Sequence, residues 1–485
     1  MIVDQYGKLF NSRSGADINN LHPAALCRHA YFGSHGFRDG NYLVPHKREV
    51  SFDERRKYSA YVNYFDRLVN ALTKPVYNEV PQREWTSSNP YWDDNGALGF
   101  LHDCDRTGMS LTRFLSETLL RGKMQGVSFV VMDSFPEGFM SSAASQKAAL
   151  EARVYPYVYR RSVESVHSAQ VDDAGALSQI VFHEPGPVVE GKATRQYRMW
   201  DRFQWAIFSD DKLEKQTLQG EHGLGTLPVI PVTLGKVDEL EDPVIPAPPL
   251  YDIARTNWEL YNVSSELREV ERKQGFSILT YPRTADQSDK TKTVGTSNAL
   301  SFDGNSSHAP AFISPDVQIP KMLMEHMSKL IATMFEQASL AGVVGVQSAA
   351  SGISKEWDFQ ATRESLRDTS RIMEEVEYKI ANVFERYTQK PINLSVKYSD
   401  NYGVTDMMSE IDRSRAMIDL DLGPKAEAQV KKFAFNAWAK DKDDITSDVI
   451  DSVIQDIESR SSDASYSERD DRKKAEEALE DEVVL

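Results

Sequence analysis

The sequence predicts an α+β protein, in which a mixed region of helices and strands is followed by a mostly helical region. Two observations carry this prediction. Between about Val154 and Pro231, apolar and polar residues alternate as they do in β-strands. After the stiff, proline-rich stretch 243–249, apolar residues recur every three to four positions, as they do on one face of a helix.

Helices and one strand are expected in the N-terminal region. Ser51 and Glu54 have the spacing of a capping box, and an apolar stripe over 58–72 predicts that one helix starts there. A second helix follows Ser110 and leads into an apolar strand over 127–132.

The strand-rich region contains a recognisable hairpin. Tyrosines alternate over 155–159, residues 172–175 have the composition of a turn, and 180–182 form the return strand. The stretches 197–208 and 227–234 continue the β-rich pattern.

Three helices are expected after the proline-rich stretch, over 249–274, from about Pro320 to 340, and over 355–388. The first two have apolar faces without an evident partner of matching length within the chain. The third would be roughly 50 Å long at about 1.5 Å per residue. Its apolar or small positions follow the three- and four-residue spacing of a helix stripe: Leu366, Thr369, Met373, Val376, Ile380, Val383 and Tyr387.

The segments around these helices differ in character. Residues 275–316 are interrupted by Gly, Pro, Asn and Ser, with short strands expected at 277–281 and 299–302. A single strand is expected over 392–398. From Thr405 onward the chain is expected to be helical and acidic, with 22 acidic and 12 basic residues.

Composition indicates a folded, soluble protein of a reducing compartment. The chain has 485 residues, of which 40% are hydrophobic, and a formal net charge of −17. It has no apolar run of 18 residues and no secretory signal, and its two cysteines cannot form a disulfide framework. The acidic balance argues against a surface that binds nucleic acid by neutralising phosphates.

No motif for catalysis or for a cofactor is present. The sequence lacks a phosphate-binding P-loop, a His-Glu-x-x-His motif, paired zinc ligands and a Gly-x-Ser-x-Gly elbow. We therefore expect no enzyme activity, no cofactor and no metal. Asp103 and Asp105 could share a divalent ion, but loop or cap roles are favoured, and Cys27 and His29 are expected to be structural.

The stretch 337–354 has 18 residues, no charge and three glycines. Three interpretations remain open: a linker between helices, a membrane-inserting loop, for which it is too polar, and a mobile loop beside a polyanion. The stretch 272–292 has a net charge of +3. It is either an ordinary solvated face or a docking surface for acidic partner loops.

The order of these parts resembles the portal proteins of tailed bacteriophages over essentially the whole chain. Residues 228–231 (Pro-Val-Ile-Pro) resemble the strand before the first stem helix of that family, and 351–354 (Ser-Gly-Ile-Ser) resemble the start of the helix after the tunnel loop. Residues 41–45 (Asn-Tyr-Leu-Val-Pro) and 61–65 (Tyr-Val-Asn-Tyr-Phe) resemble the N-terminal pattern of one subfamily.

The resemblance implies a portal fold with named parts. These are a mixed α/β wing (1–247, completed by a long helix over 355–388 and a strand over 389–404), two stem helices (248–274 and 316–340), a clip (275–315), a tunnel loop (341–354) and a helical crown (405–460). An acidic, disordered tail is expected over 461–485. The resemblance implies a ring of usually twelve subunits at one capsid vertex of the virion, made in the host cytoplasm and without contact to a membrane.

The resemblance also assigns functional residues and partners. The DNA-facing tunnel loop would comprise Gly342, Val343, Val344, Gly345, Val346, Gln347, Ser348, Ser351 and Gly352, and the partner-docking clip would comprise Arg283, Lys290 and Lys292. Double-stranded DNA would pass through the channel without sequence preference. The protein partners would be the terminase large subunit, a head-completion or adaptor protein, and the major capsid and scaffold proteins.

Two other classes of protein compete with this interpretation. A packaging ATPase would need the P-loop that is missing. A non-viral, ring-forming scaffold or channel without a nucleic-acid role remains the alternative.

Overall fold

The computed structural model describes residues 21–47, 49–86, 89–93, 98–135, 146–189, 191–238, 242–274, 278–283, 299–303, 311–313, 317–340, 352–399, 402, 417, 424–439, 449 and 452–459. The chain divides into two compact units, Met1–Tyr402 and Gly403–Leu485.

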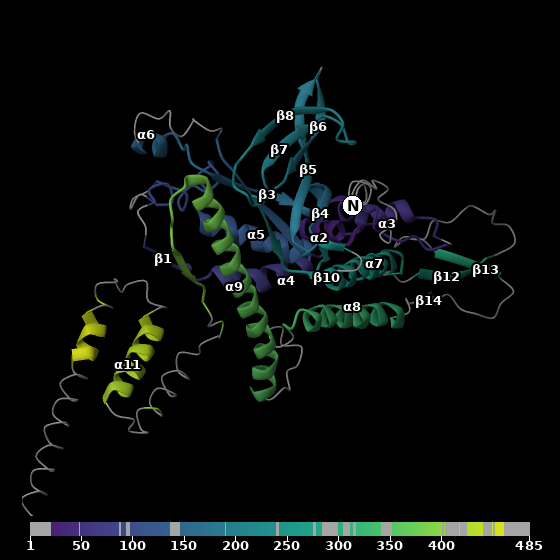
Figure 1. The fold of residues 1–485 in the computed structure, drawn as a ribbon. Helices are drawn as coiled ribbons and strands as arrows, with labels where there is room; N and C mark the ends of the chain where they lie inside the picture. The colour runs from purple at the N-terminus through teal and green to yellow at the C-terminus, as the bar shows by residue number, and fades with distance from the viewer. Residues whose placement is uncertain are drawn as a thin grey trace, which may run out of the picture. The chain divides into compact units, whose positions relative to one another are not determined.

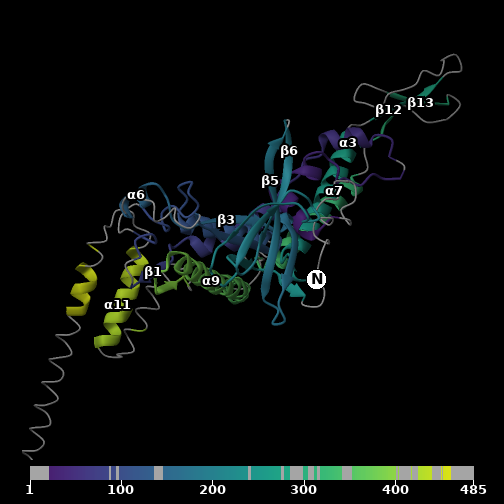
Figure 2. The same ribbon diagram turned by 45° about the horizontal axis from the view of Figure 1, so that its top comes forward.

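The largest sheet of the first unit is an antiparallel meander of five strands in the order β4-β5-β6-β7-β8 (Figure 1). Its strands are β4 (Val166–Val171), β5 (Leu177–Val189), β6 (Lys192–Trp200), β7 (Gln204–Phe208) and β8 (Gln216–Glu221). The predicted turn at 172–175 is confirmed: Asp172 Oδ1 accepts hydrogen bonds from the amides of Ala174 and Ala176 at 3.0 and 2.9 Å. Strands β5 and β6 are the longest of this sheet, and Figure 2 shows them paired side by side.

A second sheet has three strands in the order β3-β2-β9: β2 (Val127–Asp133), β3 (Tyr157–Ser162) and β9 (Val229–Thr233). Strand β2 is buried on both faces. Val127, Phe129 and Val131 face a core shared with the five-stranded sheet, whereas Val130 and Met132 belong to the core shared with α5 and α9. Burial on both faces explains the continuous apolar run that predicted this strand.

Helix α5 (Leu111–Gln125) leads into β2 as expected. Ser110 caps its N-terminus by accepting a hydrogen bond from the amide of Arg113. Gly126 closes the helix with a φ of +92°, and a Cβ atom there would lie 2.7 Å from the carbonyl oxygen of Pro246. Only glycine fits this connection.

The single helix predicted from Ser51 is wrong. The structure has two helices, α3 (Phe52–Tyr58) and α4 (Tyr64–Thr73), separated by five non-helical residues. Ser51 makes no capping bond and instead donates to Glu269 Oε1 at 3.0 Å. Asn63 caps α4 by accepting from the amide of Asp66 at 2.9 Å. Contacts to a distant helix therefore override the local capping signal.

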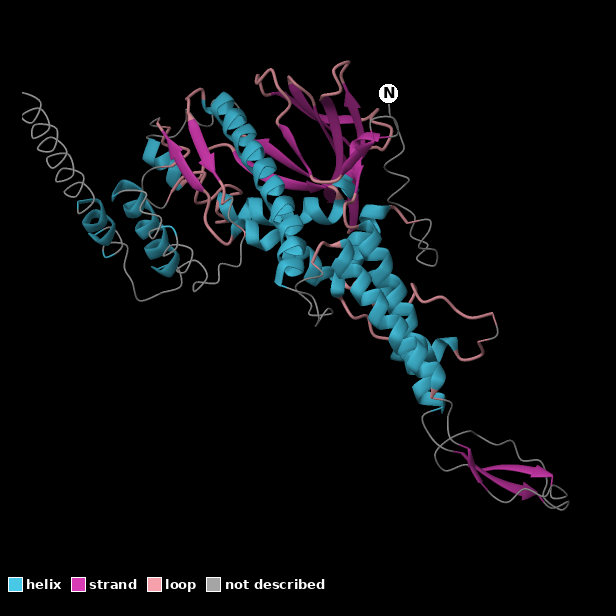
Figure 3. Ribbon diagram, turned by 90° about the horizontal axis from the view of Figure 1, so that it is seen from below, coloured by secondary structure: helices cyan, strands magenta, loops and turns pink. Residues whose placement is uncertain are grey.

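Helices α7 (Tyr251–Gln274) and α8 (Gln318–Gln337) lie side by side (Figure 3) and share a core with α2 (Pro23–Phe32) and α4. The expectation that these two helices lack partners within the chain is wrong, because they pack against each other. Between them in sequence lies a three-stranded sheet in the order β13-β12-β14. Its strands are β12 (Ile278–Arg283), β13 (Ala299–Asp303) and β14 (Ala311–Ile313), and only the first two were predicted.

Helix α9 (Gly352–Thr388) confirms the predicted long helix and begins three residues earlier than expected. Six of its seven predicted stripe residues are buried, and Tyr387 packs against the same core. The expected strand over 392–398 is shorter, β15 (Leu394–Lys397), and pairs with β1 (Gln82–Trp85), which is far away in the sequence. That pairing was not predicted.

The remaining elements are small. The first unit contains α6 (Gln146–Glu151) and the hairpin β10 (Lys236–Asp238) and β11 (Asp242–Ala247), with short 3-10 helices at His35–Phe37, Lys74–Tyr77 and Val163–Ser165. In the second unit, α11 (Pro424–Ala439) and residues 452–459 are helical, as expected there, and Lys432 forms an ion pair with Glu458. The tail expected over 461–485 lies outside the described residues. In the described part of the chain, no helix combines the length and the apolar composition needed to cross a membrane.

Candidate functional site

Helices α7 and α8 adjoin the two segments for which function was predicted. The segment assigned to the clip lies between them in sequence, and the segment assigned to the tunnel loop follows α8. Helix α7 is buried along much of its length, with Leu260, Tyr261 and Leu267 at most 8% exposed. Helix α8 buries Leu330 and Met334 near its C-terminal end, whereas Met322 and Met324 in its first half are 61% and 49% exposed.

Asn257 fixes α7 to α4. Its side chain is completely buried, and Oδ1 accepts hydrogen bonds from the Tyr61 hydroxyl at 2.9 Å and from the amides of Tyr64 and Phe65 at 3.1 and 3.0 Å. Nδ2 donates to the carbonyl oxygen of Val62 at 3.0 Å. One α7 side chain therefore satisfies amides at the start of α4 that have no partner within that helix.

A buried arginine of α3 links the segment before this helix to the next turns of α7. Arg55 is 2% exposed and donates to Glu49 Oε1 at 2.7 Å, to the carbonyl oxygen of Val44 at 2.7 Å and to Ser265 Oγ at 2.6 Å. The Arg55 guanidinium holds the pKa of the Glu49 carboxyl below its usual range. Sequence reasoning missed Arg55, since a lone arginine within a charged run gives no signal of burial.

The predicted tunnel loop falls almost entirely outside the described residues. This holds for Gly342, Val343, Val344, Gly345, Val346, Gln347, Ser348 and Ser351, and Gly352 is the first residue of α9. The structure describes the end of α8 that leads into this segment. Ala338 and Leu340 are buried, the amide of Leu340 donates to the carbonyl oxygen of Phe335 at 2.8 Å, and Thr362 of α9 donates its hydroxyl to the carbonyl oxygen of Ser339. The chain that enters the segment is thus fixed to α9.

The residues predicted for clip docking are placed only in part. Arg283 is the last residue of β12, where its backbone pairs with Asp303 of β13. Lys290 and Lys292 lie outside the described residues.

An ion pair buried under α9 holds this helix to β1 and β15. Glu377 is 0% exposed; it pairs with Arg83 and accepts from the Tyr398 hydroxyl at 3.0 Å. Arg83 also donates to Thr112 Oγ1 at 2.8 Å. Burial alone would lower the pKa of Arg83, but its hydrogen bonds to Glu377 outweigh burial and raise it. A buried pair of this kind is costly to break, because removing one partner leaves the other charge unpaired.

The two other candidate sites from the sequence are Asp103 with Asp105, and Cys27 with His29. Asp105 accepts from the amide and the hydroxyl of Thr107 at 2.9 and 2.8 Å, and Asp103 accepts from the amide of Gly108 and pairs with Arg153 at 3.0 Å. These carboxylates shape a loop before α5, as the favoured interpretation held. Cys27 is a free, buried thiol.

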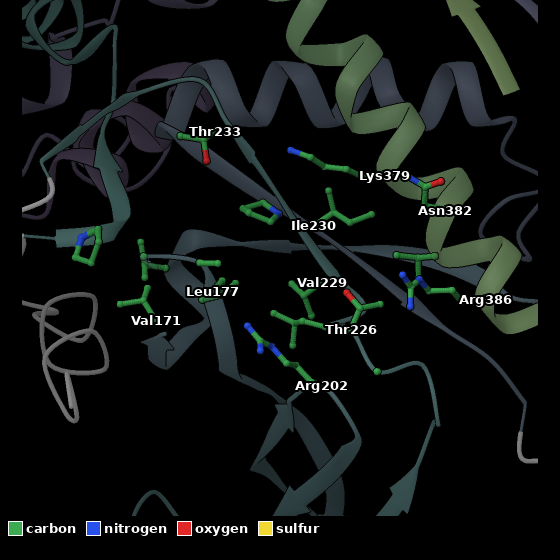
Figure 4. Close-up of a pocket in the computed structure, with 18 residues that line it drawn as sticks. Val171, Leu177, Arg202, Thr226, Val229, Ile230, Thr233, Lys379, Asn382 and Arg386 are labelled. Atoms are coloured by element: carbon green, nitrogen blue, oxygen red, sulfur yellow. The ribbon is translucent and has the colours of Figure 1, made fainter. Parts of the chain in front are cut away.

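A surface groove of about 660 Å³ lies between α9, β9 and the turns that join β4 to β5 and β6 to β7. Figure 4 shows Lys379, Asn382 and Arg386 of α9 along one side of this groove, with Arg202 beyond Thr226 and Val229. The four side chains were not singled out from the sequence, because they come from segments far apart in the chain. We call this feature the α9 groove.

Comparisons with known proteins do not assign a family. No protein-family model matches the chain, and no curated protein matches it. Among solved structures, the chain is similar to one described as "Neck of empty GTA particle computed with C6 symmetry", with a TM-score of 0.42 and 14% sequence identity. The match covers 76% of this chain and 89% of the other. A likeness at this level carries no argument about function.

Proposed function

We propose that this chain is the portal protein of a tailed bacteriophage or a phage-like particle, and that it assembles into a ring at one vertex of the capsid. One observation supports the proposal above the others. Helix α7, the β12–β14 sheet, helix α8, an uncharged segment and the 37-residue helix α9 follow one another in the order that the portal fold requires.

The proposed ring is a channel for double-stranded DNA during packaging and ejection. In the ring, the two long helices α7 and α8 form the stem, residues 275–315 form the clip, and 341–354 form the tunnel loop. The exposed side chains of Ile319, Met322 and Met324 on α8, and of Val317 just before it, are apolar surface that a neighbouring subunit would cover.

In this proposal the chain has no catalytic step. A separate motor, the terminase large subunit, docks on the clip and supplies the energy for packaging, and an adaptor protein replaces it afterwards. In this proposal residues 405–460 form the crown, and the acidic residues 461–485 follow it. The DNA slides without sequence recognition, because a neutral loop makes no ionic contact with phosphates.

Native mass spectrometry combined with negative-stain electron microscopy tests the proposal. We expect closed rings with a central hole at micromolar concentration and over a range of salt concentrations. Monomers alone under all of these conditions would contradict the ring. Rings that neither enter procapsids nor support DNA packaging would instead favour the alternative, a ring-forming scaffold or channel without a nucleic-acid role.

A further inference from the structure

The α9 groove combines cationic side chains with an aliphatic wall. Arg202, Lys379 and Arg386 contribute the charge, and no carboxylate is present among the described residues that line it. The rest of its wall is uncharged, and the half-buried Val171 and Leu177 are among its apolar members. Such a concentration of positive charge stands out in a chain whose formal net charge is −17.

The two cations on α9 have charge to offer a ligand. Within the described part of the chain, Lys379 has no ion-pair partner, and Arg386 donates to the carbonyl oxygen of Leu224 at 3.0 Å but to no carboxylate. Arg202, by contrast, already pairs with Asp172. The ligand should therefore carry its negative charge along α9.

The spacing of these side chains determines how the negative groups of the ligand must be arranged. Lys379, Asn382 and Arg386 fall three and four residues apart on one face of the helix. Seven residues of helix span about 10 Å. A single small anion cannot contact both ends of this row, but two or three carboxylates on an extended or helical segment can.

The wall of the groove excludes two other modes of recognition. None of the described lining residues is aromatic, so a nucleotide base would find no ring on which to stack. Strand β9 is at the edge of its sheet, but Pro231 in its centre has no N–H group to offer an added strand. Recognition must therefore use side chains rather than backbone pairing.

We propose that the α9 groove is a docking site for an acidic segment of a partner protein, whose carboxylates contact Lys379 and Arg386 and whose aliphatic side chains cover the half-buried Val171 and Leu177. The positive charge and the apolar wall together match a segment rich in glutamate and leucine.

Binding of a defined probe to the purified full chain tests the site. The probe is an acetylated, fluorescein-labelled peptide of glutamate, leucine and alanine, with glutamates at positions i, i+4 and i+7. We expect saturable binding in fluorescence anisotropy that weakens as salt is added. The double variant Lys379→Ala with Arg386→Ala should weaken binding at least tenfold, whereas the matched double variant Arg371→Ala with Lys397→Ala, which changes exposed cations outside the groove, should not.

Three results would overturn the proposal. The first is equal affinity of the groove variant and the unchanged protein for the peptide. The second is equal binding of a peptide with glutamine in place of every glutamate. The third is displacement of the peptide by millimolar inorganic phosphate or by a DNA duplex as effectively as by unlabelled peptide, which would define a general anion site. Thermal unfolding of each variant at an unchanged temperature verifies that the fold is intact.

Discussion

The imidazole of His29 has both ring nitrogens engaged in a largely buried position of α2. Nε2 lies 3.0 Å from Arg28 Nη2, and Nδ1 lies 2.6 Å from the Tyr42 hydroxyl. Because a guanidinium only donates, Nε2 accepts, and the proton of the neutral ring is on Nδ1. Burial, and then the charges of Arg28 and His35, lower the pKa of His29 to about 3.

This lowered pKa predicts that acid destabilises the protein. Between pH 6.5 and about 3 the unfolded chain binds a proton at His29 that the folded chain does not bind. The contribution of a neutral His29 to stability is therefore complete above pH 6.5 and is lost as the pH falls through this window. We expect the unfolding temperature to decrease from pH 7 to pH 4, and to decrease less steeply in His29→Gln.

The comparison between variants concerns the slope of unfolding temperature against pH, measured by differential scanning fluorimetry. The absolute stability also changes when two hydrogen bonds are removed, so it is not the readout. His46→Gln, at a side chain that is 65% exposed, is the control for the loss of an imidazole at the surface. Identical slopes for His29→Gln and the unchanged protein would contradict the assignment.

At the scale of elements, single polar side chains determine how helices join. Asn257 of α7 sets the start of α4, and the buried pair of Arg83 and Glu377 fixes α9 to the β1–β15 sheet. Each of these side chains bonds to a segment more than 100 residues away in the chain. Buried polar groups of this kind stabilise only when they are satisfied, so their removal has a large effect.

Asn257→Ala should lower the free energy of unfolding by about 1–3 kcal/mol, because the amides of Tyr64 and Phe65 lose their shared acceptor in a buried place. Denaturant titration followed by circular dichroism measures the change. Asn382→Ala, which removes an exposed amide of α9, should have little effect. An equal change in both variants would show that the Asn257 contacts do not determine stability.

At the scale of the whole molecule, the proposed function makes the uncharged segment the contact with moving DNA. Duplex DNA carries one negative charge per about 1.7 Å of its axis, so a ring of lysines lining the channel would bind it and slow its passage. A segment of small, uncharged side chains makes no such ionic contact.

The variant Gln347→Lys with Ser348→Lys, placed in every subunit, should leave rings and procapsids normal and should slow or stall DNA translocation. The effect should be stronger at low salt, where phosphate contacts are less screened. Gln347→Asn with Ser348→Thr, which keeps the segment neutral, is the matched control. Packaging at the unchanged rate and extent in the lysine variant would show that the segment does not face the DNA.

Much of the secondary structure could be predicted because it depends on local patterns. The stripe from Leu366 to Val383 predicted α9 because the residues that must be buried recur with the period of the helix. The turn at 172–175 was predictable because the Asp172 side chain bonds to amides only two and four residues away. The order of helices, strands and the uncharged segment, from which the portal resemblance follows, is likewise a property of the sequence alone.

Only the tertiary structure determined which distant residues meet. Ser51 has the sequence of a cap, yet the structure uses it to contact Glu269 and caps α4 with Asn63 and Asn257. Glu377 and Arg83 would be read as surface charges, but pairing across 294 residues allows both to be buried. The α9 groove also depends on this assembly, since its cations come from α9 and from the turn between β6 and β7. Local periodicity determines where helices and strands form, whereas burial and charge pairing depend on neighbours that the chain acquires only when it folds.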